Sequence, residues 1–292
     1  GDLQPLSSTL NTMKKLYTLL LTTLVLTSCG RFSNKDEKQS NSERIVCLSK
    51  QYNEIIFELN AQQNLVAVDL SSTYPPEIKA LPTVGYHRAL STEGILSMEP
   101  TMIIHDNNVG PEQVMQQMEK LKIPMMVFKT KEMGQYFGRE KEADSLNAKL
   151  DKDLLTAENA LAQYTTKPKV VVIHYGRATN VYLTMTENST TANLIEMAGG
   201  TIPIDGDRGM MQLSAEVIAK SNPDVILLTD FGYDRLGTEE QLKSLPGVST
   251  TNAAKNNRIY RVEEHDMVYF GPRTGEVILK LQELIHRNEQ VQ

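Results

Sequence analysis

The chain has 292 residues, of which 40 % are apolar and 23 % are charged, a composition typical of a soluble globular protein with one large or two medium domains. Its formal net charge of −6 argues against nucleic acid as a partner, because phosphate binding needs a basic surface. With no tryptophan and only six phenylalanines, the chain is also a poor platform for stacking single-stranded bases.

The first 28 residues have the pattern of a secretion signal. Lys14 and Lys15 precede the apolar run LYTLLLTTLVL, which is too short for a permanent membrane helix. The run ends in Leu26-Thr-Ser-Cys29, which resembles the lipobox of bacterial lipoproteins. That resemblance implies that Cys29 is lipidated and begins the mature protein, with residues 1–12 as an upstream remnant; the alternative is an ordinary signal with a chance cysteine.

Residues 30–42 are polar and lack periodicity, so we expect a flexible tether after the lipidated Cys29. Within it, Lys35-Asp-Glu37 resembles the charged run that directs some lipoproteins to the cell surface, although a solvated linker explains it as well. The predicted location is therefore the bacterial cell envelope, on the periplasmic side or the cell surface. Cys47 has no partner left for an internal disulfide and is predicted to be a buried small hydrophobe.

The first lobe is predicted to span residues 43–135. Four short apolar runs alternate with helical segments and are predicted strands, at 44–48, 64–69, 102–105 and 125–128. The helical segments between them include NEIIFEL and PEQVMQQMEKL. Strands that alternate with helices of this length indicate right-handed βαβ units and a parallel sheet.

Residues 136–166 are predicted to be one long linking helix. The segment that follows Gly138 lacks Gly and Pro as far as Tyr164, and its leucines recur near helical spacing. Such a helix measures about 40 Å at 1.5 Å per residue, enough to reach from one lobe to another. A coiled coil is the weaker interpretation, because the heptad is not sustained.

The second lobe is predicted to span residues 167–292. It begins with the strand KVVVI, continues with a helix at 190–197 that stops at Gly199-Gly200, and ends with a helix from Gly275; between them lie strands at 225–228 and 258–262. The predicted fold class is therefore α/β, with two similar lobes of mainly parallel sheet joined by one long backbone helix. A single helical linker implies a stiff hinge.

A repeat supports the two-lobe prediction. Residues 90–100 and 213–223 align without a gap, and each reads as a short helix opened by a Ser cap, stopped at Pro and followed by an apolar strand. Each copy carries one acid at the same place, Glu93 and Glu216. The capping-box spacing is not met, because each Glu lies only two residues after its Ser.

Several segments resemble haemin-binding proteins of bacterial ABC importers, which belong to the helical-backbone class together with cobalamin and siderophore binders. They are DLSSTYPP (69–76), VGYHRA (84–89) leading into the first repeat, AGG (198–200), the second repeat, and FGPRT (270–274). The resemblance spans roughly residues 43–285. Its G-Y-x-R segment is specific to the haemin branch.

This resemblance implies that Tyr86 ligates ferric haem iron and that Arg88 supports it. A phenol has a pKa of about 10, but a nearby cation and a ferric ion both favour the phenolate. In an extended segment residues two apart share a face, so the guanidinium can lie beside the phenol oxygen. Arg88 can alternatively bind a haem propionate. His87 should point the other way, as a packing or solvated residue.

A second axial ligand occurs in some members of the family, and the spacing selects none here; the possibilities are His174, Met185, Met210, Met211 and Tyr233. Arg208 and Arg235 could meet propionates from the second lobe. Tyr86, Arg88, Tyr233, Arg208 and Arg235 are thus the candidate ligand-binding residues.

Glu93 and Glu216 correspond to the acids that, in this class, pair with arginines of the two permease subunits. A pseudo-symmetric pair suits a two-fold transporter, although a Glu near a helix start is also favoured by the helix dipole.

One departure from the family is the loop Ser49–Asn53, where relatives carry a small, Gly- or Ser-rich segment. Lys50 and Tyr52 bring bulk and charge to the rim of the cleft and could contact a propionate or narrow specificity to another tetrapyrrole. No HExxH, Walker A, GxSxG or zinc-spaced cysteine pair is present. NST at Asn188 is a glycosylation acceptor only in a eukaryotic secretory pathway, which the lipobox contradicts.

The sequence predicts a lipid-anchored solute-binding protein, not an enzyme, that captures haem and hands it to an ABC permease dimer. The membrane is contacted through the lipid alone. The first alternative is the same transport role with cobalamin or a ferric siderophore as cargo. Alternatives of another functional class are a metallochelatase-like enzyme and a haem scavenger without a permease.

Overall fold

A computed structural model describes residues 43–177 and 179–287. The signal segment, Cys29 and the tether lie outside these residues. No helix within the described ranges combines the length and apolar character that crossing a membrane requires. By backbone contacts residues 44–292 form one unit, so the division at 135 and 166 stays a prediction.

The first sheet contains four parallel strands in the order β2-β1-β3-β4. They are β1 Ile45–Cys47, β2 Leu65–Val68, β3 Met102–Ile104 and β4 Met125–Met126. The two central strands, β1 and β3, are buried throughout, because helices cover both faces of the sheet. Continuous apolar runs such as IVC and MII are typical of that environment.

The helices of this part form two cores, one on each face of the sheet. On one face, α2 Lys50–Glu58 and α5 Thr130–Tyr136 pack against Ile45 and Cys47. On the other, α3 Thr92–Leu96 and α4 Glu112–Lys120 pack against Val46 and Ile103. Two short 3-10 helices, η1 Gln62–Asn64 and η2 Pro76–Ala80, flank β2. Cys47 is fully buried and free, as predicted.

The second sheet has the order β7-β6-β5-β8-β9, with β5 Val170–Gly176, β6 Val181–Met185, β7 Met210–Gln212, β8 Val225–Thr229 and β9 Ile259–Val262. Strands β5, β8 and β9 are parallel, whereas β6 and β7 are antiparallel to their neighbours. The sequence did not indicate this antiparallel edge. Five of the seven strand pairings in the described residues are parallel, so the predicted mainly parallel α/β class is confirmed.

Seven α-helices and one 3-10 helix surround this second sheet in the described residues. They are α7 Thr190–Met197, α8 Ala215–Ser221, α9 Asp230–Leu236, α10 Glu239–Lys243, η3 Val248–Thr250, α11 Asn252–Lys255, α12 Glu264–Val268 and α13 Thr274–Ile285. Their apolar faces and the strands share one core.

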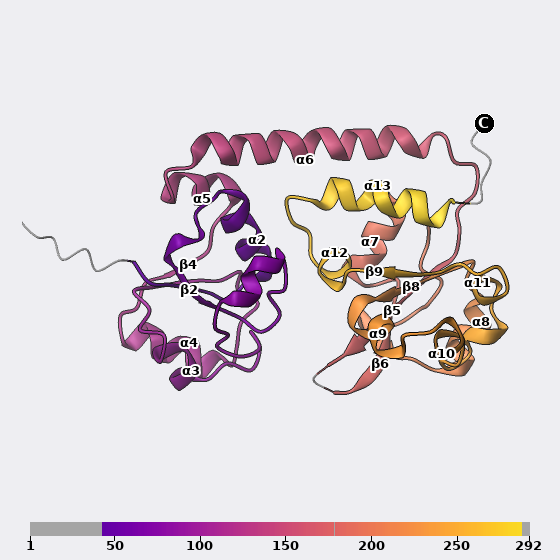
Figure 1. Cartoon of the computed structure of the whole chain (residues 1–292), viewed down its shortest axis with the longest axis horizontal. Helices are drawn as coiled ribbons and strands as arrows, with labels where there is room; N and C mark the ends of the chain where they lie inside the picture. The colour runs from indigo at the N-terminus through magenta and orange to yellow at the C-terminus, as the bar shows by residue number, and fades with distance from the viewer. Residues whose placement is uncertain (1–42, 178, 288–292) are drawn as a thin grey trace, which may run out of the picture. The chain divides into compact units, whose positions relative to one another are not determined.

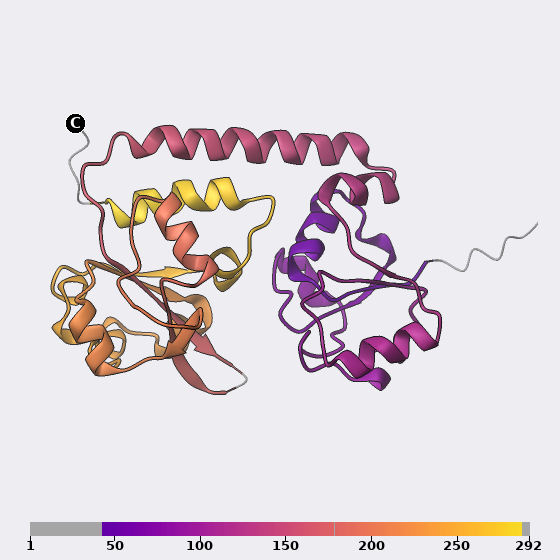
Figure 2. The same cartoon turned by 180° about the vertical axis from the view of Figure 1, so that it is seen from behind.

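The predicted linking helix is α6, Glu140–Leu161. Its 22 residues measure about 33 Å, somewhat less than expected. Ala143 near its start is buried in the core of the first sheet, and Ala157 near its end is buried in the core of the second. The helix packs on α5 and on α13 (Figures 1 and 2), so it belongs to the hydrophobic cores of both sheets.

Both copies of the repeat fold as predicted. Ser91 accepts a hydrogen bond from the Gly94 amide at 3.0 Å and opens α3, while Ser214 accepts from the Val217 amide at 3.2 Å and opens α8. In each copy a residue with positive φ precedes the proline, Glu99 at 47° in the first. The strand that follows each helix, β3 or β8, lies inside its sheet.

Candidate functional site

Tyr86 lies on a tight turn between η2 and α3. The Leu70 amide donates to the Gly85 carbonyl at 2.8 Å, and the Ala89 amide donates to the Tyr86 carbonyl at 2.8 Å, which closes the turn. Gly85 has φ +105°, a backbone conformation that is strained for residues other than glycine. The expectation of an extended segment was therefore wrong, because the chain reverses here to enter α3.

The turn nevertheless alternates its side chains as the sequence predicted. Tyr86 is 40 % exposed and Arg88 is exposed, whereas His87 between them is only 5 % exposed. The turn thus presents a phenol and a guanidinium outward.

Arg88 is hydrogen-bonded to Asn108 in this structure. Its Nε and Nη2 donate to Asn108 Oδ1 at 3.1 and 2.7 Å, and the Asn108 amide in turn donates to Asp106 Oδ1 at 3.0 Å. A guanidinium held by two hydrogen bonds has a fixed direction. The residue that holds it, Asn108, lies twenty positions further along the chain.

His87 is a buried, hydrogen-bonded residue rather than a solvated one. Its Nδ1 lies 3.2 Å from Asp69 Oδ2, and Asp69 is fully buried. Burial raises the pKa of Asp69, but the hydrogen bonds from His87, Ser71 and Ser72 outweigh burial and hold this pKa below its ordinary value. The carboxylate beneath the turn is therefore ionised at neutral pH.

Lys50 is buried, which differs from its expected place at the rim. Its Nζ lies 3.4 Å from Glu264 Oε1 and 3.6 Å from the centre of the Tyr269 ring, and the residue is only 2 % exposed. Burial lowers the pKa of Lys50 while Glu264 opposes that shift. Lys50 opens α2, so the start of this helix turns its ammonium group into the protein. Tyr52 lies in the first turn of the same helix and is half-buried, so the segment 49–53 is a helix start and not the predicted loop.

Tyr269, in the second part of the chain, lies beneath the Lys50 ammonium group, with 3.6 Å between Nζ and its ring centre. Burial raises the pKa of Tyr269. Glu264 and Asp69 add to this rise by their negative charges, and Arg88 opposes it. Sequence reasoning missed Tyr269, because it immediately precedes the FGPRT segment and carries no motif of its own.

His174 is the candidate second ligand that lies among these groups. Burial lowers the pKa of His174, Glu264 opposes the shift, and Lys50 and Arg177 reinforce it. Its ring is therefore neutral at pH 7, as metal ligation requires. Its Nδ1 lies 3.4 Å from Thr229 Oγ1, a contact that orients the ring.

The other proposed axial ligands are placed less favourably. Met185 is 2 % exposed within the second core, which argues against a role at a surface site. Met211 and Tyr233 pack against the same core, and Met210 is exposed on the edge strand β7.

The two arginines expected to meet propionates belong to the second part of the chain. Arg208 is exposed in the loop before β7, and Arg235 sits with its guanidinium 5.1 Å from the Tyr175 ring centre. Arg177, which sequence reasoning did not select, stacks on Phe231 at 3.9 Å and acts electrostatically on His174. No motif marks this residue, and its place becomes visible only once β5 and β6 pair.

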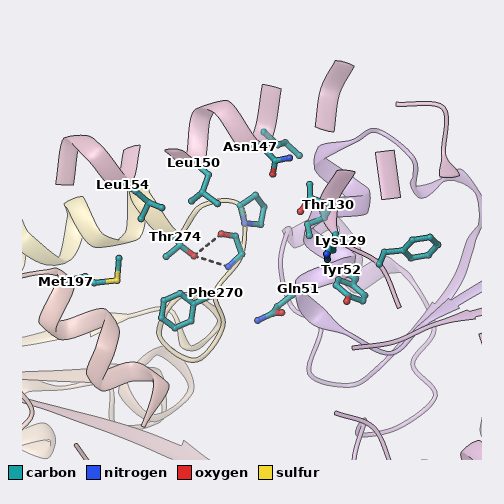
Figure 3. A pocket seen from close by; sticks show the side chains of 15 residues that line it. Gln51, Tyr52, Lys129, Thr130, Asn147, Leu150, Leu154, Met197, Phe270 and Thr274 are labelled. Carbon is teal, nitrogen blue, oxygen red and sulfur yellow. Dashed lines mark hydrogen bonds between the residues drawn. The ribbon is translucent and has the colours of Figure 1, made fainter. Parts of the chain in front are cut away.

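A cavity of about 440 Å³ lies between α2, α6 and the segment before α13, and Figure 3 shows the side chains that line it. Leu150, Leu154 and Phe270 give it apolar walls, and Thr274 Oγ1 bonds the amide and carbonyl of Gly271 at 2.9 and 2.8 Å. Tyr52 lines it, but Tyr86 and Arg88 do not. The cavity is therefore separate from the candidate site.

A buried ionic cluster joins α2 to the segment of α12 and α13. Glu54 is 1 % exposed and accepts from Arg273 Nε at 2.8 Å and from His265 Nε2. Arg273 also donates to Asp266 at 2.8 Å and lies 3.7 Å from the Tyr74 ring centre. This cluster fixes the segment that carries Tyr269.

Glu93 and Glu216 occupy equivalent positions. Each lies in the first turn of its helix, two residues after the capping serine, and each is exposed. Within the described residues no cluster of three His, Cys, Asp or Glu side chains could hold a metal ion by itself.

Comparisons with known proteins agree on the family. The family model described as periplasmic binding protein matches residues 45–265. The heme-binding protein RhuT of Roseiflexus sp. RS-1, solved in its apo form, is 32 % identical, with 85 % of this chain and all of that chain covered and a TM-score of 0.75.

Two further relatives are similar over most of their length. The periplasmic heme-binding protein BhuT, solved with two hemes, is 25 % identical over 84 % of this chain and 98 % of its own, with a TM-score of 0.74. The high-affinity heme uptake system protein IsdE of Staphylococcus aureus is 25 % identical over 86 % of this chain and 90 % of its own.

Proposed function

The chain belongs to the periplasmic binding protein family, and from this premise we propose that it captures haem and delivers it to the permease of an ABC importer. The relatives that are named for haem binding or uptake support this cargo. The observation that carries the proposal within this chain is the turn that presents Tyr86 and Arg88 outward above the buried His87. The role is binding and transfer, not catalysis.

Tyr86 is the proposed iron ligand. A phenolate is a hard ligand that suits ferric iron, and the exposed phenol can reach a planar cargo without a change in the core. Arg88 lies two residues further and is held by Asn108. From that position its positive charge favours the phenolate or binds a propionate.

His174 is the residue we favour as a second ligand among the alternatives. Its lowered pKa supplies a neutral imidazole, and the charges that act on it belong to Lys50, Glu264 and Arg177. Arg177 carries an exposed guanidinium for a propionate. We therefore add Arg177 to Arg208 and Arg235 as a candidate partner of the haem propionates. Tyr233 is a candidate for an apolar contact with the haem.

Glu93 and Glu216 are the proposed docking residues. Both are exposed carboxylates at the start of equivalent short helices, and a two-fold permease offers each the same partner. Lipidation of Cys29 would hold the protein at an envelope membrane, with residues 29–42 as the tether. The proposed first lobe spans residues 43–135, the linking helix residues 136–166 and the second lobe residues 167–292.

The test is a titration of the apoprotein with haemin, followed by absorption, with cobalamin and a ferric siderophore as competitors. We expect a shifted Soret band and phenolate-to-iron charge-transfer bands that neither competitor abolishes. Tyr86→Phe should lose those bands, whereas the matched control Tyr260→Phe, on half-exposed β9, should keep them. Preferential binding of cobalamin or the siderophore would replace haem as the cargo.

A further inference from the structure

A buried polar network lies directly beneath the Tyr86 turn. Asn53 Nδ2 donates to Ser72 Oγ at 2.8 Å, Ser72 Oγ donates to Asp69 Oδ1 at 2.6 Å, and Asp69 Oδ2 lies 3.2 Å from His87 Nδ1. Each of these residues is at most 6 % exposed. Buried polar groups are costly unless they are hydrogen-bonded, so a network of this size beneath a surface loop needs a physical reason.

The network also includes Ser71, and a Ser-His-Asp set invites comparison with a hydrolase. Ser71 Oγ lies 3.2 Å from His87 Nδ1, the same nitrogen that faces Asp69. A catalytic triad uses the two ring nitrogens for different partners, so that one receives the serine proton while the other is held by the acid. Here one nitrogen meets both partners, which argues for anchoring and against proton relay.

The anchoring fixes the His87 ring in one orientation. An ionised carboxylate only accepts hydrogen bonds, so Nδ1 of His87 carries the proton and donates it to Asp69. The backbone of His87 is held as well, because its carbonyl accepts from the Gly110 amide at 2.8 Å. With side chain and backbone both fixed, the directions in which the adjacent residues project are fixed too.

The fixed imidazole also contacts the Tyr86 ring. The two ring centres lie 4.4 Å apart, with 56° between the planes. The His87 ring therefore restricts the rotamers of the Tyr86 side chain from below. A side chain that is ordered before binding loses less entropy when the ligand arrives.

We propose that His87 and Asp69 are positioning residues, which hold the Tyr86 phenol in place for the iron of the bound cargo. This inference rests on the proposed function for its consequence in binding. The anchoring itself is a property of the apoprotein and is measured without haem.

The variants differ in whether they keep the donor to Asp69. In His87→Asn the side-chain amide nitrogen takes the place of Nδ1, whereas His87→Leu fills the space without a donor. We expect His87→Leu to weaken haemin binding about tenfold, the factor that corresponds to about one hydrogen bond, and to broaden the phenolate–iron bands. We expect His87→Asn, which keeps the donor to Asp69 but loses the ring contact with Tyr86, to bind haemin more tightly than His87→Leu and less tightly than the wild type.

Hydrogen exchange of residues 84–90 in the apoprotein is the independent measurement. His87→Leu should exchange these amides faster, while His87→Asn and Tyr86→Phe should exchange as the wild type does. If His87→Leu does not fold, Asp69→Asn replaces it, because at nearly constant size it removes the charge of the carboxylate and turns one of its two acceptor oxygens into an NH2 donor.

Unchanged exchange in His87→Leu, or equal behaviour of His87→Leu and His87→Asn, would overturn the positioning role. If the wild-type protein exchanges these amides slowly but fails to bind haemin, the anchoring of His87 by Asp69 still holds and haem is wrong as the proposed cargo. The two failures are therefore distinguishable.

Discussion

Tyr86 and His87 are neighbours with opposite surroundings, one 40 % exposed and the other 5 % exposed. The exposed phenol supplies the chemistry, and the buried imidazole joins it to a carboxylate inside the protein. Arg88 has a partner of its own in Asn108. At the scale of single residues, the candidate site is a turn with two outward side chains. Tyr86 packs on the buried His87 ring, and Arg88 is hydrogen-bonded to Asn108.

The acid stability of the protein should depend on Asp69. The pKa of Asp69 in the folded protein is below its unfolded value of about 3.9, so its stabilisation is present above about pH 4 and is lost as the pH falls through the folded pKa. We expect Asp69→Asn to unfold more easily at pH 7 and to show a shallower decline below pH 4. Urea unfolding between pH 2 and 7 measures both; an unchanged acid slope contradicts the assignment.

Glu54 should contribute strongly to stability because it is the shared acceptor of the buried cluster. Glu54→Ala removes the carboxylate that accepts from His265 and Arg273. Arg273 then retains its hydrogen bond to Asp266. We expect the free energy of unfolding to fall by about 3 kcal/mol. The control Glu196→Ala breaks the exposed pair with Lys167 and should cost less than about 1 kcal/mol. Equal losses in urea unfolding would refute the special role of Glu54.

The local pattern around Tyr86 was sufficient to predict which side chains point outward. The partners of those residues were not predictable, since Asn108 and Asp69 come from other loops and Tyr269 lies 183 positions further along the chain. Lys50 shows the same limit. A lysine near a loop is expected in solvent, and only the approach of Glu264 and Tyr269 makes its burial favourable.

At the scale of elements, the two copies of the repeat behave as one unit used twice. A capping serine, a short helix and a proline recur before β3 and β8, and local signals were enough to predict them. The antiparallel edge was not predictable from apolar runs. Only four residues separate β5 from β6, too few for the crossover that parallel pairing needs, and that spacing was the missed signal.

The contact between α6 and α13 depends on Gly275. A Cβ at this position would lie 2.5 Å from Asp153 Cβ and 2.9 Å from the Leu154 amide nitrogen. Alanine usually stabilises a helix by up to about 1 kcal/mol relative to glycine, but here we expect Gly275→Ala to destabilise by about 1–3 kcal/mol. Lys280→Ala, on the exposed side of the same helix, should change little. Thermal unfolding decides the sign, and a stabilised Gly275→Ala would contradict the close approach.

At the scale of the whole molecule, two sheets with separate cores share α6. The long helix was predictable from its leucine spacing and its lack of Gly and Pro. The Glu54 cluster that supplements it was not, because it brings α2 together with residues more than 200 positions away.

Docking is the prediction that belongs to this scale. Reversing both Glu93 and Glu216 to Arg should abolish uptake by cells that depend on this protein, because like charges would then meet at the permease. Haemin binding should stay intact, since both residues are exposed acids at the starts of their helices and are not among the proposed ligand-binding residues. Glu112→Arg is the matched control, an exposed acid in the first turn of α4. Normal uptake by the double variant would contradict the docking role of these two residues.

The central claim is that Tyr86 binds the iron of haem. Resonance Raman spectroscopy of the ferric haemin complex, excited in the charge-transfer region, tests it most directly, because only an iron-bound phenolate gives enhanced phenolate vibrations there. We predict these vibrations in the wild-type complex and in Tyr260→Phe, and their loss in Tyr86→Phe. A wild-type complex without them, or a Tyr86→Phe complex that retains them, would contradict the account.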